Sequence, residues 1–178
     1  MQQIYLNYCQ MCGKKLFLND NRSKYCLKCN FYYYSFPTAC VVLLLYTDSG
    51  DYLFIERSKN PDKGKLDFPG SFIRVEETAE ITCKRVAFEE ISLSNLDLEY
   101  FGSSHDYYGN DKNIPIISLL FTSKIDDSTI KRISPKNDAS RAIFLSKKQV
   151  NNSKLAYASM IGEIEKLENY ILGKKASS

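Results

Sequence analysis

The stretch from Pro69 to Leu93 decides the fold of this chain and reads PGSFIRVEETAEITCKRVAFEEISL. After the Pro-Gly-Ser turn the pattern changes to helical spacing, and Thr78 is a residue type that caps helix N-termini. In such a helix positions 86, 89 and 90 share one face, because residues three and four apart are neighbours. Two of them are Glu89 and Glu90, and carboxylate oxygens are the ligands that Mg²⁺ and Mn²⁺ prefer. The sequence therefore predicts a strand–turn–helix unit with an acidic face suited to a divalent cation.

The same stretch resembles the Nudix box, G-x5-E-x7-R-E-U-x-E-E-x-G-U, in which U is a bulky apolar residue. The comparison needs no gap and sets these residues on positions of the pattern: Ser71, Glu77, Arg85, Glu89, Glu90 and Leu93. The segment KGKLDFPGSF at residues 63–72 is also similar to the usual approach to the box. The resemblance implies an α/β protein with a Nudix-like α/β/α sandwich and a mixed sheet.

The resemblance also implies roles for individual residues. Glu89 and Glu90, with the carbonyl of Gly70, would hold the Mg²⁺ or Mn²⁺ that bridges the pyrophosphate of a substrate. Arg85 and Glu77 would pair and hold the loop against the helix. We therefore expect a hydrolase that cleaves the pyrophosphate of a nucleoside diphosphate linked to another group. No substrate-binding residue is assigned from the sequence.

Three positions depart from the Nudix pattern. Val86 stands where the family has a glutamate of the metal and base cluster, and valine neither binds a cation nor accepts a proton. Ser71 and Ser92 replace glycines, at a cost of about 1–2 kcal/mol wherever φ is positive. We expect slower hydrolysis, or a catalytically silent Nudix fold that binds a nucleotide or a partner as a regulator. Residues considered as substitutes for the missing carboxylate are His105, Asp106, Asp111 and Asp138.

Two CxxC pairs near the N-terminus, Cys9/Cys12 and Cys26/Cys29, have the spacing of a zinc site. Four sulfur ligands leave no open position for a substrate, so the metal would be structural, and residues 1–35 are interpreted as a zinc ribbon. Unligated thiols or a redox dithiol are the alternative. A ribbon before the box is similar to the NADH-pyrophosphatase branch of the family. Residues 93–120 lack the SQPWPFPxS-type segment of that branch, so NADH specificity is not implied.

The ribbon has several candidate uses. The tyrosines at positions 32–34 and the nearby basic residues suit stacking on bases and contact with phosphates, as in a nucleic-acid-binding module. Because aromatic side chains usually pack, we instead expect these tyrosines to pack the ribbon onto the main domain. The ribbon would then be a stabilising appendage or one that forms a homodimer. The net charge of +3 argues mildly against nucleic acid.

Composition narrows the remaining classes. The chain of 178 residues is 44% hydrophobic, enough for a folded core, and its single histidine, His105, excludes sites that need several histidines. The longest apolar run, residues 39–46, is far shorter than the roughly 20 residues that cross a membrane. Residues 1–11 do not resemble a secretory signal. We expect a cytoplasmic protein without structural disulfides, in which Cys40 and Cys83 are core residues.

The rest of the chain alternates strands and helices. Domain boundaries are expected at 1–35 for the ribbon, 36–173 for the Nudix-like domain and 174–178 for a frayed tail. A final helix is expected from about Ser153 to Leu172, with Gly173 as its stop. The other expected elements are strands near 38–46, 52–57, 96–103, 114–125 and 142–145, a helix after Thr78 and a short helix after Ser146.

Overall fold

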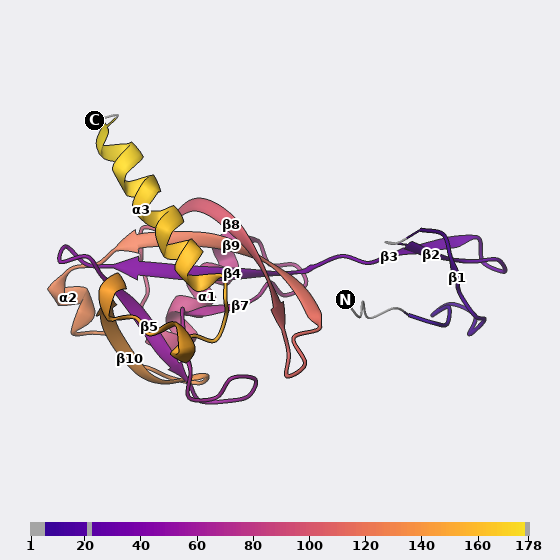
Figure 1. Ribbon diagram of the computed structural model, residues 1–178, viewed down its shortest axis with the longest axis horizontal. Coiled ribbons are helices and arrows are strands. Elements are labelled where there is room, and N and C mark those ends of the chain that lie inside the picture. The colour runs from indigo at the N-terminus through magenta and orange to yellow at the C-terminus, as the bar shows by residue number, and fades with distance from the viewer. Residues whose placement is uncertain (1–5, 21–22, 177–178) are drawn as a thin grey trace.

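The computed structural model describes residues 6–20 and 23–176, which form a small ribbon and a larger layered domain (Figure 1). The ribbon is an antiparallel sheet of β1 (Phe17–Leu18), β2 (Ser23–Cys26) and β3 (Phe31–Tyr34), with β2 in the middle. A short segment, residues 35–37, joins the ribbon to the first strand of the domain. Residues 1–5 and Arg22 of the expected ribbon lie outside the described residues.

The domain is built on a seven-stranded mixed sheet. Its strands are β4 (Thr38–Tyr46), β5 (Asp51–Arg57), β6 (Leu66–Asp67), β7 (Gly70–Phe72), β8 (Glu99–Tyr108), β9 (Ile114–Lys124) and β10 (Ala139–Ser146). The main path runs β10-β5-β4-β9-β8, while β6 pairs with β5 and β7 with β4. β4 lies parallel to β9, whereas the other pairs are antiparallel. The mixed sheet that the resemblance implied is therefore confirmed.

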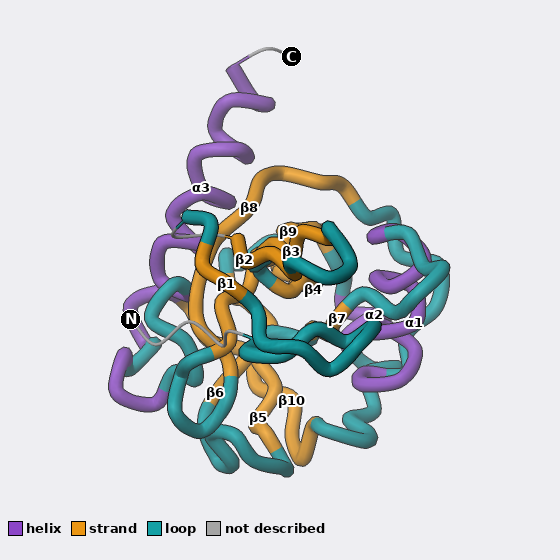
Figure 2. Tube along the Cα trace, turned by 90° about the vertical axis from the view of Figure 1, so that its right-hand side faces the viewer, coloured by secondary structure: helices purple, strands orange, loops and turns teal. Residues whose placement is uncertain are grey.

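Helices cover both faces of this sheet. They are α1 (Ala79–Ile91), α2 (Asp127–Ile130) and α3 (Met160–Ala176), with 3-10 turns at 147–149 and 152–154. Figure 2 shows α1 and α3 on opposite sides of the strands. Along β4, Val41 and Leu43 belong to the core cluster under α1, and Leu44 belongs to the cluster under α3. This period of two is typical of a strand buried on both faces, and the α/β/α sandwich is confirmed.

Both ends of α1 follow from local sequence. The Thr78 hydroxyl accepts the N–H of Ile81 at 3.3 Å, so the predicted cap is confirmed. The helix ends at Ser92, whose φ of 60° lies in the left-handed region where the box has a glycine. Gly70, before the helix, is required by close approach, since a Cβ there would lie 2.8 Å from the Val41 carbonyl oxygen.

Two expectations about the C-terminal part are wrong. α3 begins at Met160 rather than near Ser153, because residues 152–154 form a 3-10 turn and Leu155 then pairs with Leu66 as an isolated bridge. Gly173 does not stop the helix, which continues to Ala176. An interior glycine costs a helix only about 1 kcal/mol, which is too little to end it. Residues 177 and 178 of the expected tail lie outside the described residues.

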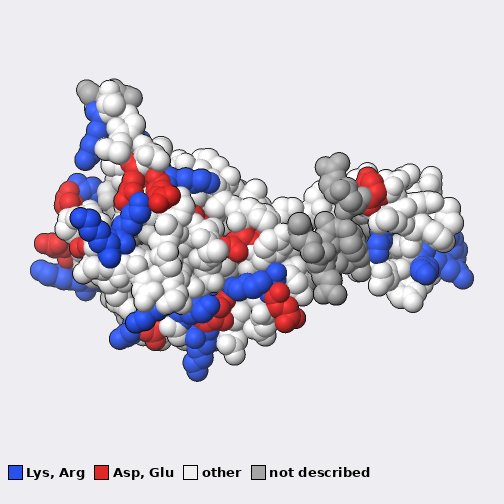
Figure 3. Space-filling view, in the orientation of Figure 1, with Lys and Arg blue, Asp and Glu red and all other residues white. Residues whose placement is uncertain are grey.

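The ribbon tyrosines do not pack onto the domain. Tyr32 and Tyr34 keep 45% and 58% of their surface exposed, so the expectation of packing is wrong, and the space-filling view shows the ribbon as a lobe at one end (Figure 3). Cys40 and Cys83 are buried in the domain, as expected. None of the helices in the described ranges is long and apolar enough to cross a membrane.

Candidate active site and zinc centre

A pocket of about 150 Å³ lies against the sheet, between the end of α1 and the start of α3. Acidic residues dominate its charge, with one arginine among them: Asp67, Glu90, Asp106, Asp138, Glu163 and Arg57. Gly70 and Ser71, at the start of the box, line the same pocket. A hollow with this excess of negative charge favours cations and disfavours a bare anion.

Glu90 is the box glutamate that lines the pocket. Its side chain is buried, and its Oε2 accepts the Gly70 N–H at 3.3 Å. Burial, followed by repulsion from Asp67 and Asp138, raises the pKa of Glu90 to about 8. The ionised carboxylate therefore lacks enough positive charge around it, which is what a bound divalent cation would provide.

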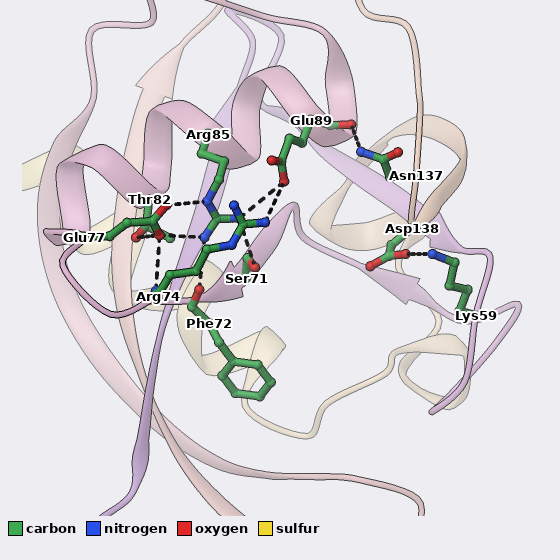
Figure 4. Close-up of polar contacts among 10 residues, drawn as sticks. All are labelled: Lys59, Ser71, Phe72, Arg74, Glu77, Thr82, Arg85, Glu89, Asn137 and Asp138. Carbon is green, nitrogen blue, oxygen red and sulfur yellow. Dashed lines mark hydrogen bonds and ion pairs between the residues drawn. The ribbon is translucent and has the colours of Figure 1, made fainter.

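Glu89, the neighbouring box glutamate, is held by two arginines near the C-terminal end of α1 (Figure 4). Its Oε2 lies 3.3 Å from Arg85 Nη1 and 3.6 Å from Arg74 Nη2, and its side chain is 37% exposed. It is not among the residues that line the pocket. The structure thus does not bring the two adjacent glutamates together in one cluster, although the sequence placed both on one metal.

Arg85 is the centre of the polar network under the box (Figure 4). Its Nε and Nη2 each donate to Glu77 at 2.8 Å, so the pairing that the resemblance implied is present as a bidentate ion pair. Nη2 also donates to the Phe72 carbonyl at 3.1 Å. The two bonds from Arg85 to Glu77 are the main cause that lowers the pKa of Glu77 to about 2, and a hydrogen bond from the Thr82 hydroxyl contributes. The network ties the loop before α1 to the helix.

Val86 does not face the pocket. Its side chain is 1% exposed and belongs to the core cluster under α1, beside Leu43 and Ile55. A glutamate at this position would have to turn out of an apolar cluster to reach a cation. The departure from the Nudix pattern is therefore built into the packing of this helix.

The four residues considered as substitutes separate into two groups. Asp106 and Asp138 line the pocket, whereas His105 and Asp111 do not. Asp138 is ion-paired with Lys59 at 2.7 Å, and both side chains are more than half exposed. Asp106 accepts the N–H of Ser159 at 3.0 Å, which ties it to the start of α3.

Two acidic residues of the site were missed in the sequence, Asp67 and Glu163. Asp67 pairs with Arg57 at 2.5 Å in the pocket wall, and burial raises the Asp67 pKa. Glu163 is 3% exposed and accepts a hydrogen bond from the Ser104 hydroxyl. Each is a single acidic residue without a motif around it. The position of Asp67 directly before the Phe-Pro-Gly turn was the one signal that could have placed it at the pocket.

The four predicted zinc ligands lie together in the ribbon. Their sulfur atoms are all within 4.8 Å of one another, and they form the one such group of potential metal ligands in the described part of the chain: Cys9, Cys12, Cys26 and Cys29. Two of the Sγ–Sγ distances are 4.0 Å and 3.7 Å. Tetrahedral zinc with bonds of about 2.3 Å sets sulfur atoms roughly 3.8 Å apart, so these residues fit Zn²⁺. The Tyr33 hydroxyl lies 3.2 Å from Cys9 Sγ and lowers the pKa of that thiol to about 6.

Comparison with known families agrees with this fold. The profile described as NUDIX domain matches residues 36–161. Among curated proteins, the chain is similar to the NAD-capped RNA hydrolase NudC of Haemophilus influenzae, with 26% identity over 115 residues. That match covers 62% of this chain and 43% of the relative, so the chain spans less than half the length of the curated relatives it matches.

Solved structures show the same architecture. A NUDIX hydrolase from Nitrosomonas europaea superposes with a TM-score of 0.60 at 18% identity, covering 92% of this chain and 93% of that chain. The NUDIX domain of Shewanella oneidensis NrtR, solved with ADP ribose, gives a TM-score of 0.65 at 18% identity over 83% of this chain and 94% of that chain. At this level of identity the similarity shows the fold alone.

Proposed function

Because this chain belongs to the NUDIX domain family, we propose that it hydrolyses the pyrophosphate of a nucleoside diphosphate linked to another group. The observation that carries the proposal is Glu90, a buried box carboxylate that faces a pocket and accepts one hydrogen bond from the described residues, from the Gly70 N–H. The similarity to an NAD-capped RNA hydrolase and the ADP ribose bound by a structural neighbour favour a substrate of this class.

The pocket residues fit one Mg²⁺ or Mn²⁺ ion. Glu90 would hold it, with Asp138 and the Gly70 carbonyl as the other candidate ligands. The chemistry that such an ion supplies is neutralisation of the pyrophosphate charge and activation of a water molecule. Glu89 does not fit as a ligand in this arrangement, because Arg85 and Arg74 hold its carboxylate.

The chain's own residues hold the Glu90 carboxylate and the adjoining loop in place at the pocket. The Gly70 N–H fixes the Glu90 carboxylate, and the Arg85–Glu77 pair keeps the loop from Phe72 to the helix in place. Arg57 is the one basic side chain among the described residues that line the pocket, and it is already ion-paired with Asp67. A diphosphate would therefore depend on a divalent ion for its binding, rather than on an arginine.

A catalytically silent nucleotide-binding protein is the second candidate. The observation that favours it is the burial of Val86 in the core, which removes one carboxylate from the family's cluster. With Glu89 also tied to two arginines, a single helix glutamate is left for the metal. Turnover should accordingly be slow compared with an enzyme that has all three.

We further propose that residues 1–35 form a structural zinc ribbon in front of a domain of residues 36–173. The cysteine geometry supports it, since the four thiolates fit a closed tetrahedral site. None of the described ribbon residues lines the pocket, so zinc should be needed for the fold of the ribbon rather than for hydrolysis.

The test is hydrolysis of a panel of ADP-ribose, NADH, dinucleoside polyphosphates and oxidised nucleotides, with Mg²⁺ or Mn²⁺. We expect metal-dependent turnover of at least one compound, reduced at least a hundredfold in Glu90→Gln. The matched control is Glu89→Gln, at the neighbouring position, which should lose less activity. Binding of a panel compound without turnover by the natural chain would instead establish the silent protein, and no turnover with no metal binding would refute both.

A further inference from the structure

Five aromatic side chains form one connected row on the ribbon and the segment that follows it. Cross-strand register sets Phe17 opposite Tyr25, and Tyr25 opposite Tyr32. The row then continues along the chain at every second residue. We call it the aromatic face: Phe17, Tyr25, Tyr32, Tyr34 and Phe36, with successive ring centroids 6.0, 5.9, 6.5 and 6.0 Å apart. The two Tyr–Tyr contacts are stacked, with interplanar angles of 25° and 24°.

The aromatic face is turned away from the core of the ribbon. Tyr33, which alternates with Tyr32 and Tyr34, points to the cysteines and contacts Cys9. Four of the five rings on the other side stay exposed, up to 74% for Phe36, while Tyr25 between them is half-buried. Large aromatic side chains are normally buried, and a connected exposed set of them indicates a binding surface.

The charge of the ribbon favours a polyanion. Five of the six charged residues within 1–35 are basic, whereas the remaining chain has one more acidic residue than basic ones. Lys14, Lys15 and Lys28 form no ion pair with any described residue, and Figure 3 shows blue side chains along one edge of the ribbon. Leu16 is buried in the ribbon core, whereas its neighbours Lys15 and Phe17 are exposed.

We propose that the aromatic face binds single-stranded nucleic acid, with bases stacked on the tyrosine and phenylalanine rings and phosphates near the ribbon lysines. Flat exposed rings interleaved with positive charge are what unpaired bases and a phosphate backbone require. A second copy of the chain would set two positively charged ribbons against each other, which charge repulsion opposes. Even with a tetrathiolate zinc centre, formally −2, the ribbon keeps a net charge of +2. The binding needs no hydrolysis, so it stands or falls independently of the proposed function.

The test uses the full zinc-loaded chain and a fluorescein-labelled oligouridylate of about 16 nucleotides without a 5′ phosphate. Fluorescence anisotropy should show binding at about 50 mM salt that weakens steeply toward about 200 mM, because counterions are released from the strand. A duplex of the same length should bind more weakly, since its bases are already stacked and paired. Tyr32→Ala and Tyr34→Ala should each weaken binding about fivefold or more.

Phe31→Ala is the matched control. Phe31 lies on the same strand with 51% exposure, but on the side of the sheet that contacts Tyr33. The Phe31→Ala variant should bind the oligouridylate with the affinity of the wild type. The zinc content of each variant shows whether its ribbon is folded. Absence of binding at low salt, or equal losses in Phe31→Ala and Tyr34→Ala, would overturn the proposal. A dimer in light scattering that Tyr34→Ala dissociates would also overturn it, because the occupant would then be a second copy.

Discussion

Replacing Glu90 with glutamine should stabilise the metal-free protein while it removes the metal ligand. Burial and repulsion from Asp67 and Asp138 raise the Glu90 pKa from its ordinary 4.5 to about 8. Between these two pH values the folded protein holds a proton that the unfolded chain has released. The contribution of this group to stability is therefore fully present below pH 4.5 and is lost as pH rises toward 8. Glutamine keeps an oxygen for the Gly70 N–H, so mainly the titration is removed.

The size of the effect follows from the same interval. A pH of 7 lies about two and a half units above the ordinary pKa of 4.5, and each unit is worth about 1.4 kcal/mol. The Glu90 carboxyl therefore lowers the free energy of unfolding at pH 7 by about 3 kcal/mol. For a chain of this length, Glu90→Gln should raise the melting temperature by about 6–12 °C at pH 7. The difference should shrink toward zero as the pH falls to 4.5.

The assay is thermal unfolding of zinc-loaded protein without added Mg²⁺, across pH 4.5 to 8. Glu89→Gln is the control, because that carboxylate is ion-paired with Arg85 and Arg74 and should gain nothing from neutralisation. If Glu90→Gln melted no higher than the wild type at pH 7, or gained as much at pH 4.5, the account of Glu90 as a buried and uncompensated carboxylate would be refuted.

Three further predictions concern the box and the ribbon. Val86→Glu should lower the free energy of unfolding by roughly 3 kcal/mol or more in urea titration, because it sets a carboxyl in an apolar cluster; a variant as stable as the wild type would contradict the core placement. Glu77→Gln should speed tryptic cleavage at Arg74 at pH 7, and equal cleavage rates would speak against the loop-holding role. Since the Glu77 pKa is about 2, the difference in stability from the wild type, measured by urea titration, should fade as the pH drops from 4.5 toward 2. Cys12→Ser should abolish zinc binding and unfold the ribbon while the circular dichroism of the sandwich persists; full retention of zinc would exclude the four-cysteine site.

Sequence patterns predicted the parts of the fold that depend on local spacing. The helix after Thr78 and the long strand at 38–46 are confirmed, because a cap residue and a buried apolar run act within a few residues. The four cysteines are likewise gathered as their spacing predicts. Each of these features is determined by neighbours in the chain.

The wrong expectations depend on tertiary contacts that spacing does not contain. Apolar residues near 155 have helical periodicity, yet Leu155 pairs with the Leu66 strand, and the helix starts only at Met160. That the adjacent glutamates of α1 share a metal stays a prediction; in the structure Glu89 is ion-paired with Arg74 from the preceding loop and with Arg85, contacts that helical spacing does not contain.

The wrong expectation about the ribbon tyrosines also depends on tertiary contacts. Aromatic side chains were expected to pack because most do, and the rule does not say whether a partner surface lies within reach. Residues 35–37 connect the ribbon to the sandwich, from which it stands apart (Figure 1), and the side chains of Tyr32 and Tyr34 stay exposed. The distribution of charge along the chain, basic in the ribbon and slightly acidic elsewhere, was visible in the sequence, but the net charge of +3 concealed it.

The most direct test of the central claim is a phosphorus NMR time course of ADP-ribose with Mg²⁺ and the full chain. We expect the pyrophosphate resonances of the substrate to disappear and two phosphomonoester resonances to replace them, as water breaks the P–O–P bridge. The same mixture with Glu90→Gln should keep its pyrophosphate signals. Pyrophosphate signals that persist with the wild type across the whole substrate panel, or hydrolysis that proceeds equally in Glu90→Gln, would contradict the account of a hydrolase built on this pocket.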